Sequence, residues 1–128
     1  MILHHIGIVV NDIEKYEASM IYEEKVLQVF DPVQQSKLAL YKNFGSCYIE
    51  LIQPMNENSY TMNFLKKNGN GFHHLCFKVV SKEVMHEIVK KKKLIFINGP
   101  FPAILFDNRN VYFYFSRNKE IVEFLIEN

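Results

Sequence analysis

A pair of adjacent histidines followed by a short apolar run occurs twice in this chain, and it constrains the fold more than any other feature. The first pair is His4-His5, followed by Ile6–Val10, and the second is His73-His74, followed by Leu75–Val79. The chain has only five histidines, so four of them fall in these two segments. The recurrence predicts two halves built on one plan, since self-similarity along a chain indicates a repeated structural unit.

The two halves have the same order of predicted elements. In each, an apolar strand precedes a stretch with helical periodicity, and three short strands follow. In the first half the strand covers residues 2–10, the helix 13–26, and the later strands lie within 28–53. In the second half the strand covers 72–80, the helix 81–92, and the strands 94–97, 111–116 and 121–126, with a Gly/Pro-rich loop at 98–102. We therefore expect an α+β fold of two βαβββ modules, 1–58 and 70–128, joined by a short linker helix.

Composition limits the class of protein. A length of 128 residues with 48% apolar residues fits one compact domain, residues 1–128, and a net charge of +1 gives no reason to expect nucleic acid as a partner. No apolar run reaches the roughly 18 residues of a membrane span. Cys47 and Cys76 lie in apolar runs and no signal peptide is evident, which predicts a cytoplasmic protein with two buried thiols.

Each half also ends with one glutamate inside an apolar strand. These are Glu50, within Tyr48–Ile52, and Glu123, within Ile121–Leu125. A buried, unpartnered carboxylate costs several kcal/mol, so each glutamate must face water or meet a positive partner. A divalent cation bound by two histidines and two glutamates would satisfy both carboxylates, because imidazole and carboxylate suit Zn, Ni, Co, Mn or Fe.

Other interpretations of these residues remain open at the level of the sequence. A single histidine in an apolar strand is more often a core residue than a ligand, and a single glutamate more often marks the solvated face of a strand. Neighbouring residues of a strand point to opposite faces, so His4 and His73 could be the ligands in place of His5 and His74.

The repeated segments resemble a known superfamily. The residues concerned are Leu3–Ile13, Tyr48–Leu51, Gly71–Cys76 and Ile121–Phe124, and they are similar to the vicinal oxygen chelate (glyoxalase, bleomycin resistance, dioxygenase) superfamily. The run Glu50–Pro54 together with His73-His74 most resembles methylmalonyl-CoA epimerase. The resemblance implies a curled mixed sheet around a metal-binding cup, with His5, Glu50, His74 and Glu123 as ligands of one Zn, Ni, Co or Mn ion. It also implies a homodimer.

The same resemblance implies a metal-dependent isomerase or lyase acting through a metal-stabilised enediolate. Glu123 would be the principal base, and Glu50 a ligand and proton partner. The substrate would be a small thioester, as in the epimerase, or a hemithioacetal, as in the alternative, glyoxalase I (lactoylglutathione lyase). A non-catalytic small-molecule binding or resistance protein is the third alternative.

Two further features carry weaker predictions. Arg109 precedes the aromatic strand and could bind a substrate carboxylate or thioester tail, although a surface role is the usual one for a loop arginine. The aromatic residues from Tyr112 to Phe115 are expected to alternate between the core and the cup wall.

Overall fold

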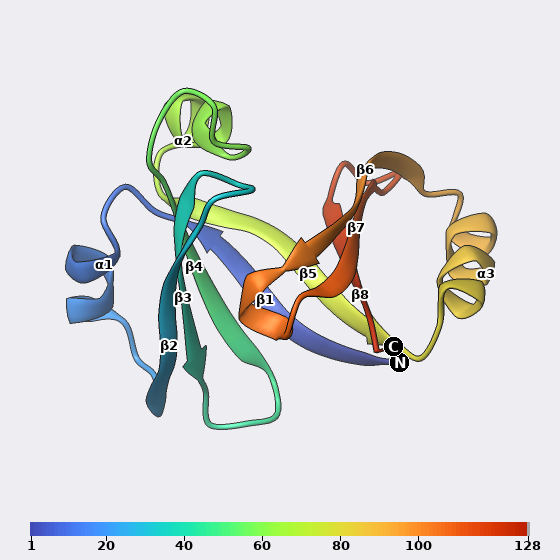
Figure 1. The fold of residues 1–128 in the computed structure, drawn as a ribbon, viewed down its shortest axis with the longest axis horizontal. Coiled ribbons are helices and arrows are strands. Elements are labelled where there is room, and N and C mark those ends of the chain that lie inside the picture. The colour runs from blue at the N-terminus through green and yellow to red at the C-terminus, as the bar shows by residue number, and fades with distance from the viewer. Residues whose placement is uncertain (128) are drawn as a thin grey trace. The chain divides into compact units, whose positions relative to one another are not determined.

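The structure is a computed structural model that describes residues 1–127. Figure 1 shows short helices flanking long strands, and the elements follow the predicted order. They are β1 (Ile2–Val9), α1 (Ile13–Ser19), β2 (Glu24–Asp31), β3 (Ser36–Lys42), β4 (Tyr48–Pro54), α2 (Met62–Asn68), β5 (Gly71–Val79), α3 (Lys82–Lys92), β6 (Ile95–Ala103), the 3-10 turn η1 (Ile104–Phe106), β7 (Arg109–Phe115) and β8 (Ile121–Ile126). Within residues 1–127, every helix is too short or too polar to cross a bilayer.

The strands form a mixed sheet in the order β2-β3-β4-β1-β5-β8-β7-β6. The first and last strands of each module pair in parallel, β1 with β4 and β5 with β8, and the later strands of each module pair antiparallel. The expected α+β class, with two βαβββ modules and a mixed sheet, is confirmed. The helix α2 lies between the modules along the chain, where the linker helix was expected.

Close contacts group the residues into two compact units that almost coincide with the modules. The N-terminal unit is His5–His73, and the C-terminal unit combines Met1–His4 with the chain from His74 onward. The boundary therefore falls inside β1 and inside β5, between the two histidines of each pair.

In the N-terminal unit, α1 covers a small apolar core of Val10, Ile13, Ala39, Tyr41 and Leu51. The helix begins at the cap residue Asp12, whose carboxylate accepts a hydrogen bond from the Lys15 backbone N–H at 3.0 Å. The prediction of a helix to residue 26 is wrong. The helix ends at Ser19, where Met20 turns to an extended conformation, and residues from Glu24 onward pair with β3. The helical periodicity of the sequence continues to residue 26, but residues from Glu24 onward form backbone hydrogen bonds with β3 in place of a helix.

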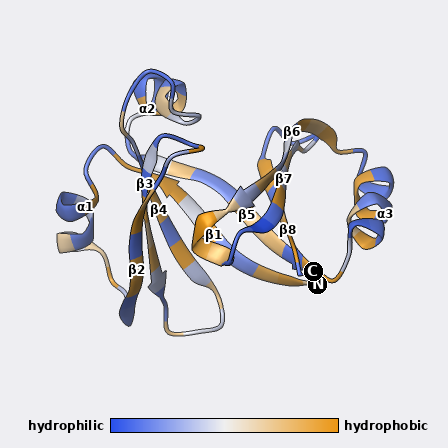
Figure 2. Ribbon diagram, viewed as in Figure 1, coloured by the Kyte–Doolittle hydropathy of each residue, from blue (hydrophilic) through white to orange (hydrophobic). Residues whose placement is uncertain are grey.

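In the C-terminal unit, α3 covers a larger and more aromatic core. The helix begins at Ser81, whose hydroxyl accepts a hydrogen bond from the Val84 N–H at 3.2 Å. Figure 2 shows α3 as alternating bands of hydrophilic and hydrophobic residues, as expected of a helix with one buried face. The core beneath it contains Val79, Met85, Tyr112, Tyr114, Val122, Phe124 and Ile126.

Residues 98–102 belong to a strand, so the prediction of a loop there is wrong. They lie within β6, a strand at the end of the sheet order that pairs only with β7 among the described residues. Prolines are tolerated on an edge strand because one side of the strand needs no backbone donor. The ladder is irregular between Asn98 and Phe101, and Gly99 has a φ of 114°.

Candidate metal and proton-transfer site

The N-terminal unit brings His5 and Glu50 together through the parallel pairing of β1 and β4. His5 lies opposite Tyr48 in the ladder, and Gly7 lies opposite Glu50. The glutamate is thus two residues beyond the histidine's ladder partner, on the same face of the sheet. The Nε2 atom of His5 lies 3.4 Å from Oε1 of Glu50.

The C-terminal unit repeats this arrangement in β5 and β8. His74 lies opposite Ile121, and Cys76 lies opposite Glu123, so the glutamate is again two residues beyond the histidine's partner. The Nε2 atom of His74 lies 3.0 Å from Oε1 of Glu123. The two modules therefore build the same His–Glu pair in the same register.

Both glutamates point away from the helix that covers their unit. Leu51 belongs to the core under α1, so its neighbour Glu50 faces the opposite side of the strand. Val122 and Phe124 belong to the core under α3, so Glu123 between them also faces away from the helix. That side is not solvated at these positions: the exposed fraction is 0% for His5, 6% for Glu50, 2% for His74 and 4% for Glu123.

The other histidine of each pair has a different environment. His4 is half-buried, and its ring packs edge-on against Phe106 at 4.9 Å between centroids. His73 is also half-buried and packs edge-on against Phe64 at 5.0 Å. Within the described residues, the Nε2 atoms of His5 and His74 each lie within 3.4 Å of a buried glutamate oxygen. This favours His5 and His74 as ligands over His4 and His73, and the choice stays a prediction.

The donor atoms of the four residues suit a divalent metal. Carboxylates held at 4–6% exposure require a positive or hydrogen-bonding partner, and an imidazole provides one. Imidazole nitrogen with carboxylate oxygen is a donor combination that Zn, Ni, Co and Mn accept. His5, Glu50, His74 and Glu123 are thus residues that could hold a metal ion.

Arg109 and the cysteines are placed differently from the four residues. Arg109 begins β7 opposite Ala103, is half-buried, and follows two residues in the left-handed conformation, Asp107 and Asn108. Cys76 is buried, as expected, but Cys47 is only half-buried, so the prediction of two buried thiols is wrong for Cys47. Partial burial raises the pKa of the Cys47 thiol, and the positive potential of His5 opposes this rise.

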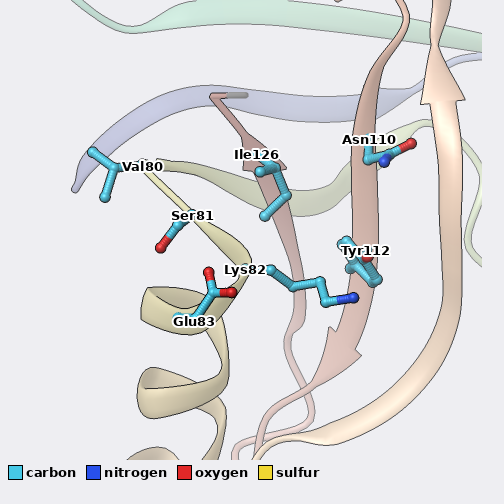
Figure 3. Close-up of a pocket in the computed structure, with 7 residues that line it drawn as sticks. All are labelled: Val80, Ser81, Lys82, Glu83, Asn110, Tyr112 and Ile126. Atoms are coloured by element: carbon cyan, nitrogen blue, oxygen red, sulfur yellow. The ribbon is translucent and has the colours of Figure 1, made fainter.

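A pocket opens at the start of α3, on the helix side of the sheet (Figure 3). Its lining includes Ser81, Lys82, Glu83 and Tyr112, and none of the predicted site residues. Tyr112 belongs to the core under α3, whereas Glu123 faces the other way, so this pocket is separate from the His74–Glu123 pair.

The sequence did not identify an aromatic contact at the C-terminal pair. The ring of Phe113 packs edge-on against the ring of His74, with centroids 5.6 Å apart. The expected alternation along β7 is confirmed for Tyr112 and Tyr114, which lie in the core under α3, and it places Phe113 on the opposite face. The alternation of side chains along the strand could therefore predict the face on which Phe113 lies, but not its contact with His74.

Comparisons with known proteins identify the family of this chain. The Glyoxalase/Bleomycin resistance protein/Dioxygenase superfamily model matches residues 4–115. The mitochondrial methylmalonyl-CoA epimerase of Bos taurus is 33% identical over 98 residues, which cover 72% of this chain and 54% of that protein. The chain thus spans about half the length of this curated relative.

Solved structures have the same fold. A hypothetical protein from Bacillus halodurans C-125 has a TM-score of 0.83 and 29% identity, and the match covers 99% of this chain and 94% of that one. Streptomyces coelicolor methylmalonyl-CoA epimerase, in complex with 2-nitronate-propionyl-CoA, has a TM-score of 0.79 at 22% identity, covering 97% and 95%. Since the superfamily model spans both modules and both His–Glu pairs' histidines, the chain belongs to the glyoxalase/bleomycin resistance protein/dioxygenase superfamily.

Proposed function

We propose that this protein is a metal-dependent isomerase that moves a proton at the carbon beside a thioester carbonyl, as methylmalonyl-CoA epimerase does. The observation that carries the proposal is the repeated His–Glu pair, built in the same register in both modules. A single buried pair could serve packing alone. Two pairs with equal register and similar burial indicate a shared chemical role.

We propose that His5, Glu50, His74 and Glu123 together hold one divalent ion, of Zn, Ni, Co or Mn. The supporting facts are the donor types and the burial of all four residues. Such an ion would supply Lewis-acid stabilisation for negative charge on a carbonyl oxygen. The protein's share is to keep four donors free of bulk water and to fix both imidazole rings.

The two glutamates are proposed to move the proton. Glu123 takes it from the substrate carbon, the C–H electron pair moves toward the carbonyl, and Glu50 in its acid form delivers a proton to the opposite side of the same carbon. The net result is inversion, with no proton gained or lost by the substrate. A positioned carboxylate of this kind contributes about 10²–10⁴-fold in rate.

The relatives support an epimerase more than a lyase. The Bos taurus relative is a methylmalonyl-CoA epimerase, and the Streptomyces coelicolor epimerase was solved with an acyl-CoA analogue. Neither protein supports lactoylglutathione lyase activity. For a substrate of this class, Arg109 is proposed to bind the carboxylate or the thioester tail, since guanidinium pairs well with carboxylate and phosphate.

The experiment is an exchange assay. The purified protein, loaded in turn with Zn, Ni, Co or Mn, is mixed with one stereoisomer of methylmalonyl-CoA in D₂O. Deuterium entry at the substrate carbon is followed by mass spectrometry, and inversion is followed by a stereospecific coupled assay. We expect deuterium entry and inversion together, because the proton leaves and returns through exchangeable carboxylates.

A parallel arm offers methylglyoxal with glutathione to the same metal-loaded samples. Turnover of neither substrate by protein with a full metal complement would reject both named activities and leave only superfamily membership. An Arg109→Ala variant should raise KM more than it lowers kcat, and Arg109→Lys should recover part of the loss. A homodimer and a cytoplasmic location remain predictions; light scattering in solution tests the first.

A further inference from the structure

We propose that Phe113 is a positioning residue for the His74–Glu123 pair, holding the imidazole plane of His74 so that Nε2 faces the carboxylate. The inference rests on the function proposed above only for its catalytic consequence, since the positioning itself is a property of the metal-free protein. Every residue it uses lies in the C-terminal unit.

Phe113 is a neighbour of both residues of the pair: it lies opposite Glu123 in the ladder, and its ring contacts the ring of His74. In the β7/β8 ladder it lies directly opposite Glu123. Its ring meets the His74 ring at an interplanar angle of 88°, with centroids 5.6 Å apart. Edge-to-face packing within 4.5–7 Å is a favoured aromatic geometry, so rotating the imidazole about its own χ2 would lose this contact. The same ring orientation sets Nε2 of His74 3.0 Å from Oε1 of Glu123.

Phe113 is itself held from behind by Phe101. The two rings are stacked, with centroids 5.7 Å apart and an interplanar angle of 23°. Phe101 reaches this position because β6 runs very close to β7 at Gly99. A Cβ on Gly99 would lie 2.7 Å from the Val111 carbonyl oxygen and 2.9 Å from the Tyr112 Cα. The absence of a side chain at Gly99 therefore allows the approach that brings Phe101 over Phe113.

The N-terminal unit has no aromatic ring at the corresponding position. Leu40 lies opposite Glu50, as Phe113 lies opposite Glu123. The His5 Nε2 to Glu50 Oε1 distance is 3.4 Å, against 3.0 Å for His74 and Glu123. The pair whose glutamate lies opposite Phe113 is thus the closer of the two pairs.

The test compares Phe113→Leu with Phe113→Tyr, which keeps the ring, and with Phe115→Leu as a matched control. Phe115 is half-buried on the same strand and the same face, and pairs with Ile121. The first measurement is made on metal-free protein labelled at histidine, by recording contacts between His74 and residue 113 ring protons and the line widths of His74 in NMR spectra. The second is the zinc dissociation constant, from competition with a chelator.

In Phe113→Leu we expect broadened or averaged His74 signals and zinc binding weakened by up to about tenfold, the span that aromatic pair energies permit. Phe113→Tyr and Phe115→Leu should keep sharp His74 signals and zinc affinity within about twofold of wild type. If Phe113→Leu fails to fold, Phe101→Leu takes its place, with a smaller effect in the same direction.

Unchanged His74 signals and zinc affinity in the folded Phe113→Leu or Phe101→Leu protein would overturn the positioning role. Equal loss in Phe115→Leu would also overturn it, because the effect would then be general packing. A protein that turned over no thioester would reject the proposed function, yet the His74 spectra of metal-free protein would still decide the role of Phe113.

Discussion

The two modules share the placement of their His–Glu pairs but differ on the other face of the sheet, beneath the helices. In the N-terminal module the tyrosine at position 41, next to the ladder partner of Glu50, lies in a polar cluster: its hydroxyl donates to Glu17 at 2.6 Å, and Lys25 lies 2.7 Å from the same carboxylate. In the C-terminal module the corresponding tyrosine, Tyr114, packs edge-on against Phe96 and Phe124.

This contrast separates what strand register imposes from what packing allows. Register fixes which side chains face each other, so both modules produce a His–Glu pair on the side away from the helix. On the helix side, packing is less restrictive, because different neighbours can bury a tyrosine. Tyr41 donates a hydrogen bond to Glu17, whereas Tyr114 packs against aromatic rings. Substitutions at the shared positions should therefore change the same property in both modules, and substitutions at the divergent positions should not.

The largest expected effect comes from Glu123→Gln and Glu50→Gln. Each removes a proposed proton carrier without changing side-chain volume, so kcat should fall by about 10²–10⁴-fold, with the greater fall for Glu123→Gln. The measurement is kcat with saturating methylmalonyl-CoA, normalised to metal content. Exposed Glu120 supplies the control, since Glu120→Gln should act like wild type. Full activity in Glu123→Gln would remove its proton-transfer role.

Next in size is the loss of metal on removing either imidazole. His5→Ala and His74→Ala should each weaken zinc binding by more than the 10–100-fold typical of outer-sphere partners. Zinc content after dialysis and a chelator-competition constant provide the measurement, and exposed His86, on α3, supplies the control as His86→Ala. A large loss for one histidine with none for the other would show that the two pairs do not share an ion.

A third prediction concerns the close approach of β6 and β7 at Gly99. The ladders of β2 and of β6 are both irregular, but the irregularity in β2, between Lys25 and Leu27, contains no glycine. Gly99→Ala forces a side chain onto a residue with φ of 114° and against backbone atoms 2.7–2.9 Å away. We expect a loss of about 1–3 kcal/mol in unfolding free energy, seen as a lower Tm. Gly45→Ala is the matched control, because a Cβ added at Gly45 would meet no atom within 4 Å. An unchanged Tm for Gly99→Ala would contradict the geometry on which the support of Phe113 rests.

Much of this architecture could be predicted from the sequence, because hydrophobic periodicity and the repeated motif both report local structure. The order of elements and β8 at Ile121–Ile126 followed from those two signals. The repeat also suggested the two histidine pairs and the two glutamates as candidate ligands, and the family resemblance pointed to His5 and His74, which stay a prediction. The end of α1 and the strand at residues 98–102 did not, because each depends on a neighbouring strand whose ladder outcompetes the local preference. The choice between His4 and His5 depends on which face of β1 is buried. Alternation along the strand shows that the two side chains face opposite ways, but not which of the two is buried.

The smallest expected effect tests the polar cluster of Glu17, Lys25 and Tyr41 in the N-terminal module. Lys25, and then the Tyr41 hydroxyl, hold the pKa of the Glu17 carboxyl below its usual range, and burial, followed by Glu17, raises the pKa of Tyr41. Tyr41→Phe removes one hydrogen bond to a charged group, so the unfolding free energy at pH 7 should fall by about 1–2 kcal/mol. Tyr114→Phe, in the aromatic setting, should change it less.

The pH dependence gives the sharper result. Because the pKa of Glu17 is depressed in the folded state, its stabilising contribution is present above the ordinary value of 4.5 and is lost as the pH falls through the lower, folded value. The difference between wild type and Tyr41→Phe in urea unfolding should therefore be largest at neutral pH and should shrink in acid. For Tyr114→Phe the difference should be nearly the same from acid to neutral pH, since neither Phe96 nor Phe124 titrates. A Tyr41→Phe difference that stayed constant down to pH values below the folded pKa would mean that the hydroxyl does not stabilise the ionised form of Glu17, and the two tyrosines would then be equivalent after all.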